Sequence, residues 1–102
     1  MLMRLSPQSQ AIIHQAVVQR FGYLAQVRLF GSRLDDTAKG GDIDLHVRVQ
    51  GGVLNPIWEA SLLAAQLQRQ LDGRKVDVRL LDETQNALPV DALALSEGIL
   101  LT

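Results

Sequence analysis

Residues 41–49, GDIDLHVRV, carry the clearest structural pattern in the sequence. Apolar side chains at positions 43, 45, 47 and 49 alternate with polar side chains at positions 42, 44, 46 and 48. Strict alternation of this kind predicts a β-strand with one face in the core and one polar face. Asp42 and Asp44 are two residues apart, so they share the polar face of this strand.

Helical and extended patterns surround this strand on both sides. Ser6-Pro7 and Asn55-Pro56 each have the form of an N-cap followed by a proline at the first helical position. Apolar spacing and glycine stops predict helices over residues 7–21, from 56 to the glycine at 73, and from 89 to about 98. Strands are predicted over residues 27–30, 43–49 and 76–81, and residues 99–101 are a candidate short strand.

This order of elements is helix, strand, strand, helix, strand, helix. It predicts an α/β (α+β) fold with a small mixed β-sheet, helices packed on one face and a polar face that is partly open. A chain of 102 residues fits one domain, 1–102.

Composition narrows the classes of function. The chain has 10 basic and 11 acidic side chains and a net charge of -1, which argues against stable binding of nucleic acid. It contains no cysteine, and no apolar stretch approaches the ~20 residues that a membrane span needs. The N-terminus lacks the apolar region of a signal peptide. We therefore expect a cytoplasmic protein with no membrane association.

Three aspartates and a glycine-serine turn carry the predicted chemistry. Two carboxylates on one strand face repel each other unless a divalent cation lies between them, and Mg²⁺ favours such oxygen ligands. Asp77 lies between two valines on the strand over 76–81 and faces away from them. Gly31 and Ser32 follow a strand, where a tight turn can bind phosphate through its backbone N–H groups. Each feature taken alone is also consistent with a solvated strand face or an ordinary turn.

Taken together, the residues predict phosphoryl transfer assisted by two Mg²⁺ ions. Asp42 and Asp44 would bridge the ions. Asp77 would complete the shell of the activating ion and accept the proton of the nucleophile. Arg33 follows the phosphate turn and is a candidate contact for the triphosphate, although a surface arginine fits the pattern equally well.

The strings LFGSR (29–33) and GDIDL (41–45) resemble the signature of the DNA polymerase beta-like nucleotidyltransferase superfamily. The short length, the later string KVDV (75–78) and the ending ALSEGILL (94–101) are similar to its minimal branch, the MNT proteins. The resemblance covers nearly the whole chain. It implies the polymerase beta-like nucleotidyltransferase fold, ATP as substrate and transfer of AMP.

The resemblance also implies a biological role and site residues. Many MNT proteins are antitoxins whose partner is a HEPN-family toxin, an all-helical RNase that receives AMP on a tyrosine. Gly31 and Ser32 match the phosphate-binding turn of the family, and Asp42, Asp44 and Asp77 match its metal triad. The sequence departs from the family at position 36, where an aspartate replaces the third glycine of the usual loop.

Three functions remain open from the sequence. The first is Mg²⁺-dependent transfer of AMP from ATP to a toxin tyrosine. The second is a non-enzymatic antitoxin that masks its partner by binding, which the apolar tail over 99–101 and the altered loop suggest. The third is a nucleotidyltransferase acting on a small molecule, for which a homodimer would have to build the pocket. No residue can be assigned to the donor base, and the oligomeric state is open.

Two further side chains could have either a structural or a functional role. His46 shares the aspartate face and is expected to be an exposed strand histidine rather than a contact for nucleotide or acceptor. Trp58, in the first turn of a helix, is expected to pack against the edge of the sheet. Stacking on a base or anchoring a partner are the alternatives for Trp58.

Overall fold

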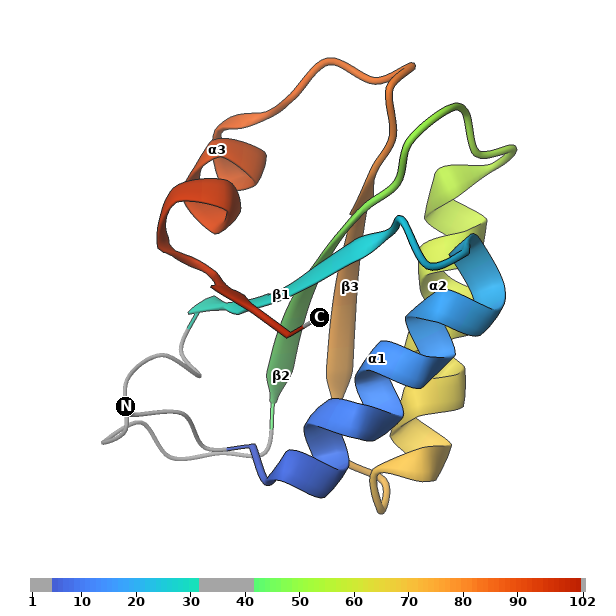
Figure 1. Ribbon diagram of the computed structural model, residues 1–102, viewed down its shortest axis with the longest axis vertical. Coiled ribbons are helices and arrows are strands. Elements are labelled where there is room, and N and C mark those ends of the chain that lie inside the picture. The colour runs from blue at the N-terminus through green and yellow to red at the C-terminus, as the bar shows by residue number, and fades with distance from the viewer. Residues whose placement is uncertain (1–4, 32–41, 102) are drawn as a thin grey trace.

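The computed structural model describes residues 5–31 and 42–101, and these residues form three helices and four strands (Figure 1). The predicted element order is confirmed, with strand ends shifted by one residue at positions 26 and 48. The elements are α1 (Pro7–Phe21), β1 (Gln26–Phe30), β2 (Ile43–Arg48), α2 (Pro56–Gln70), β3 (Val76–Leu81), α3 (Pro89–Glu97) and β4 (Ile99–Leu100).

The starts of α1 and α2 differ in how they are capped. The N–H of Ser9 donates to Oγ of Ser6 over 3.1 Å, so Ser6 is the N-cap that the sequence predicts. Asn55 precedes Pro56 but adopts the left-handed conformation (φ 55°, ψ 64°), and its side chain makes no cap hydrogen bond. The predicted start of α2 is right, whereas the capping role of Asn55 is wrong. Its carbonyl accepts from the N–H of Glu59 over 3.0 Å instead.

The four strands form one mixed sheet in the order β3-β2-β1-β4. β1 runs antiparallel to both β2 and β4, while β2 and β3 are parallel. Parallel neighbours need a crossover, and α2 supplies it between β2 and β3. The mixed sheet is therefore confirmed, and β3 and β4 are its edges.

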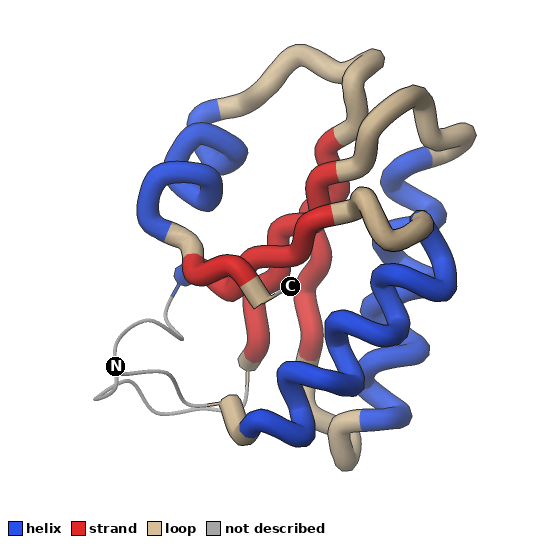
Figure 2. Tube along the Cα trace, in the orientation of Figure 1, coloured by secondary structure: helices blue, strands red, loops and turns tan. Residues whose placement is uncertain are grey.

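The core lies between one face of the sheet and the helices α1 and α2 (Figure 2). Alternate residues of the strands point into it, as the pattern of residues 41–49 predicts. The fully buried members include Val27, Leu29, Ile43, Leu45 and Val47 from the sheet and Ile13, Val17, Leu63 and Leu67 from the helices. Burial of such side chains stabilises the fold by roughly 1.5–3 kcal/mol each.

The placement of α3 corrects the expectation that the helices share one face. α1 and α2 cover one face of the sheet, and α3 lies against the other (Figure 1). The reason is electrostatic, because Asp91 of α3 binds His46 and Arg79 on the polar face of the sheet. The polar face is thus covered over its middle and open beyond α3. No helix in the described ranges has the length and apolar character that crossing a membrane requires.

Candidate active site

The two strands that carry the aspartates are neighbours in the sheet. In the parallel pairing of β2 and β3, Asp44 lies opposite Asp77. Neighbouring strands are about 4.8 Å apart, so these two residues are adjacent on the same face. Asp42 precedes β2 by one residue and is exposed, as is Asp77, while Asp44 is half-buried. The strand of Asp77 therefore lies beside that of Asp42 and Asp44, which is the adjacency that joint action of the three aspartates requires.

Gly31, which directly follows β1, lies next to these aspartates. Phe30, the last residue of β1, pairs with Asp44, so the chain leaves β1 directly beside the aspartate. Gly31 has φ +77°, and a Cβ built on it would lie 2.6 Å from Oδ2 of Asp44. A side chain at position 31 would therefore collide with the carboxylate as well as strain the backbone. The absence of a side chain brings the Gly31 backbone against Asp44.

The chemistry of this donor set suits Mg²⁺, which takes oxygen ligands from one or two carboxylates and completes its shell with water and substrate phosphates. In the conformations that residues 5–31 and 42–101 adopt, no three acidic or histidine side chains come close enough to hold a metal ion. The site therefore offers carboxylates on a common face rather than a preformed cage. Phosphate oxygens would have to supply further ligands.

Part of the predicted site lies outside the described residues. Ser32 and Arg33, the remaining residues of the phosphate turn, belong to the segment 32–41. Asp36, at the position of the family's third glycine, belongs to it too. Their roles stay predictions.

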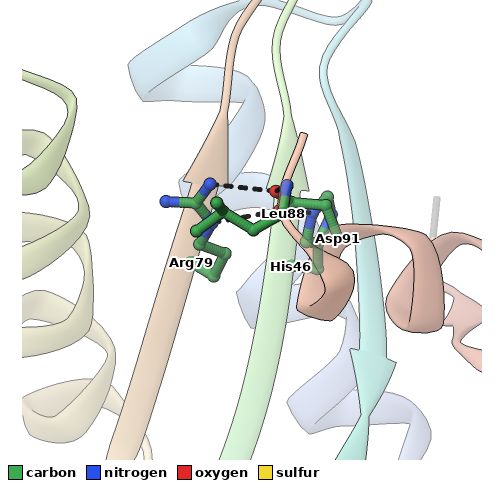
Figure 3. A network of polar contacts seen from close by, with 4 residues as sticks. All are labelled: His46, Arg79, Leu88 and Asp91. Carbon is green, nitrogen blue, oxygen red and sulfur yellow. Dashed lines mark hydrogen bonds and ion pairs between the residues drawn. The ribbon is translucent and has the colours of Figure 1, made fainter. Parts of the chain in front are cut away.

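A buried polar network lies beside the aspartates and was not predicted (Figure 3). His46 is fully buried, so the expectation of an exposed histidine is wrong. Its Nε2 lies 2.8 Å from Oδ1 of Asp91. Arg79, the partner of His46 in the register of β2 and β3, donates from Nε and Nη2 to the two oxygens of Asp91 over 3.0 and 2.9 Å. The backbone N–H of Leu88 also donates to Asp91, over 2.7 Å.

The charges of this network follow from its contacts. The Arg79 guanidinium, together with the Leu88 N–H and His46, holds the pKa of Asp91 far below its usual range. Burial lowers the pKa of His46 despite its hydrogen bond to Asp91. An ionised carboxylate only accepts hydrogen bonds, so the neutral imidazole carries its hydrogen on Nε2. Nδ1 is then a buried acceptor without a partner in the described structure.

Two sequence signals could have revealed this network. His46 and Arg79 lie on the polar faces of the strands over 43–49 and 76–81, and two basic side chains on neighbouring strands favour an acidic partner. Asp91 is an acid in the first turn of a short apolar helix.

The predicted position of Trp58 is also wrong. Trp58 is 61% exposed and does not pack against the sheet edge as expected.

The comparisons with known proteins identify the fold. No protein-family model and no curated protein matches the sequence. Similar solved structures exist, however. One is the tri-AMPylated Shewanella oneidensis HEPN toxin in complex with MNT antitoxin, with a TM-score of 0.67, 23% identity, and coverage of 95% of this chain and 72% of that chain.

Two further complexes agree. The toxin–antitoxin pair MntA–HepT matches with a TM-score of 0.66 and 23% identity, over 95% of this chain and 72% of that chain. A toxin–antitoxin structure with AMP-PNP matches with a TM-score of 0.68 and 24% identity, over 96% of this chain and 73% of that chain. At these identities the likeness establishes fold alone. The chain therefore has the α+β fold of the MNT nucleotidyltransferase structures, as the motif resemblance implied.

Proposed function

We propose that this chain is a Mg²⁺-dependent nucleotidyltransferase that transfers AMP from ATP to a tyrosine of a HEPN-family toxin and acts as its antitoxin in the cytoplasm. The observation that carries the proposal is the pairing of Asp44 with Asp77 on neighbouring strands, with Gly31 against Asp44. The similar complexes support the partner and the donor, since one contains a tri-AMPylated HEPN toxin and another contains AMP-PNP.

The residues have distinct roles in this reaction. Mg²⁺, when bound by Asp42, Asp44 and Asp77, supplies charge neutralisation at the phosphates. The exposed carboxylate of Asp77 accepts the proton of the tyrosine hydroxyl. A bond then forms between the tyrosine oxygen and the α-phosphorus, while the bond from the α-phosphorus to the bridging oxygen breaks and pyrophosphate leaves. The Gly31 turn, which Ser32 and Arg33 would complete, orients the triphosphate for this attack.

Labelled ATP tests the proposal directly. The chain is incubated with Mg²⁺, ATP labelled at the α-phosphate and a HEPN-family toxin, and label on the toxin is measured. Wild type is expected to transfer label, and Asp77→Asn to transfer it at least about 100-fold more slowly, the range typical of a lost general base. Asp72→Asn is the matched control, because Asp72 is an exposed acid outside the site whose left-handed backbone asparagine tolerates.

Two results would contradict the proposal. One is absence of label on a toxin that demonstrably binds the folded chain. The other is equal transfer by wild type and Asp77→Asn.

A second candidate, masking of the toxin by binding alone, is favoured by one observation: no three acids among the described residues converge to hold a metal. Under masking, Asp44→Asn would neutralise the toxin as well as wild type does. Under AMP transfer, that variant would bind the toxin without neutralising it. Label appearing on free small acceptors in the absence of any toxin would instead support a small-molecule transferase.

A further inference from the structure

The outer edge of β3 is open to pairing with another strand. Two hydrogen bonds fix which backbone groups of β3 face β2: the N–H of Ile43 donates to the carbonyl of Lys75, and the N–H of Val49 to that of Leu81, each over 2.9 Å. Groups facing the two sides of a strand alternate, so the N–H and C=O groups of residues 76, 78 and 80 face away from the sheet.

Most of these outward groups have no hydrogen-bond partner among residues 5–31 and 42–101. The N–H of Val76 donates to Oε1 of Gln68 over 3.1 Å. Within the described ranges, no hydrogen bond reaches the outward groups of Val78 or Leu80. An edge of this kind is a template for a further strand.

A groove with both apolar and polar lining runs along this edge. It encloses about 220 Å³ between β3 and the N-terminal half of α2, where it is lined by Ile57, Ala60 and Ala64. Ile57 is 81% exposed, and Val78, which also lines the groove, is half-buried. A strand added to β3 would cover both side chains.

The charges on β3 complement a second β3 strand in one antiparallel register. When two copies pair with Val78 on the twofold axis, Asp77 of each copy lies opposite Arg79 of the other, and Val76 lies opposite Leu80. Opposite charges that face each other across strands stabilise the pair, and like charges destabilise it. The strand is therefore self-complementary, as a twofold interface requires.

Both charged groups are available for this contact. Arg79 uses Nε and Nη2 to bind Asp91, which leaves the N–H groups of Nη1 without a partner in the described structure. Asp77 is exposed and makes no hydrogen bond or ion pair with the described residues. A second copy would supply both with partners.

We propose that two copies of this chain associate through the β3 edges, in an antiparallel register centred on Val78. The two four-stranded sheets then form one continuous sheet of eight strands. This register places a guanidinium of the second copy beside Asp77, at the border of the aspartate site. The inference rests on the edge of β3 and its surroundings and does not require the proposed function.

Charge variants at the twofold axis test both the interface and its register. Val78→Glu and Val78→Lys each place two like charges opposite one another, and each is expected to weaken dimerisation at least about tenfold. An equimolar mixture of the two variants pairs Glu with Lys and is expected to restore the dimer. Sedimentation equilibrium measures association, and circular dichroism verifies the fold. The same substitutions at Val90, an exposed valine on α3, are the control and leave association unchanged.

A cysteine variant gives a second measurement that tolerates weak association. The chain has no native cysteine. In the proposed register, the Cα atoms of the two copies of residue 78 are about 5.5 Å apart, within disulfide range. Val78→Cys is therefore expected to form a covalent dimer on mild oxidation, and Val90→Cys is not.

Three results would overturn the proposal. Wild type could be monomeric up to submillimolar concentration, which would leave the edge to a strand of another protein. Val78→Glu and Val78→Lys could each dimerise as wild type does. The mixture of the two could remain monomeric although wild type dimerises, which would exclude the register.

Discussion

At the scale of single residues, Gly31 links backbone conformation to the aspartate site. Gly31→Ala is expected to displace the Asp44 carboxylate, because the new Cβ would lie 2.6 Å from its Oδ2. Gly73 provides a matched comparison, since it has the same φ of +77° but no atom within 4 Å of a built Cβ. Gly73→Ala thus isolates the cost of the left-handed backbone, about 1–2 kcal/mol.

Both alanine variants are measured for transfer of labelled AMP and for urea unfolding. Gly73→Ala is expected to lose stability and keep its rate of transfer. Gly31→Ala is expected to lose more stability and also at least about tenfold in rate, in line with misplacement of a site group. Equal rates for the two variants would show that the close approach of Gly31 to Asp44 has no role in transfer.

At the scale of elements, the polar network of His46, Arg79 and Asp91 docks α3 onto the sheet, and its buried histidine makes stability depend on pH. His46 is neutral in the fold, with its pKa lowered by burial, whereas in the unfolded chain it titrates near 6.5. Below about pH 6.5, His46 therefore binds a proton in the unfolded state but stays neutral in the folded state. The free energy of unfolding is expected to be level above this pH and to fall below it, by up to about 1.4 kcal/mol per pH unit.

His46→Gln tests this assignment by urea unfolding between pH 5 and 8, because glutamine keeps a donor towards Asp91 and does not titrate. The variant is expected to be less stable than wild type at neutral pH. Its free energy of unfolding is expected to stay level below pH 6.5, where that of wild type falls. Asp91 and Asp82 have lowered pKa values as well, so their stabilisation is present above the unfolded value of about 3.9 and is lost only at lower pH. A decline that persists in His46→Gln would rule out His46 as its source.

The elements also show what the sequence could and could not predict. Period-two alternation located β2 and β3, and the cap at Ser6 located α1, because these are local signals. The face occupied by α3 depends on a contact between His46 and Asp91, 45 residues apart, which no local period encodes. The local pattern therefore predicts an exposed His46, and this is wrong. The exposure of Trp58 is not predicted for a related reason, since the surroundings of Trp58 depend on how α2 packs against the rest of the chain.

At the scale of the whole molecule, the topology brings the aspartates together. The sequence placed Asp42 and Asp44 on one strand face, but only the parallel pairing of β2 with β3 sets Asp77 beside Asp44. The convergence of the three carboxylates on a metal stays a prediction, because the described side chains do not converge without one. A bound cation is expected to draw the three carboxylates together and so to stabilise the folded chain, whether or not a toxin is present.

Mg²⁺ with ATP is expected to stabilise the folded chain, because only the folded chain brings these carboxylates together. At ten times the dissociation constant the gain is about 1.4 kcal/mol, measured as a shift in the urea midpoint. Asp77→Asn is expected to remove most of this gain, yet to change stability without ligand by no more than about 0.5 kcal/mol, as for other exposed positions. Asp72→Asn controls for the loss of one exposed negative charge and should respond as wild type does. If Asp77→Asn gains as much from Mg²⁺ and ATP as wild type, the ligand binds elsewhere and the facing aspartates of β2 and β3 do not form the site.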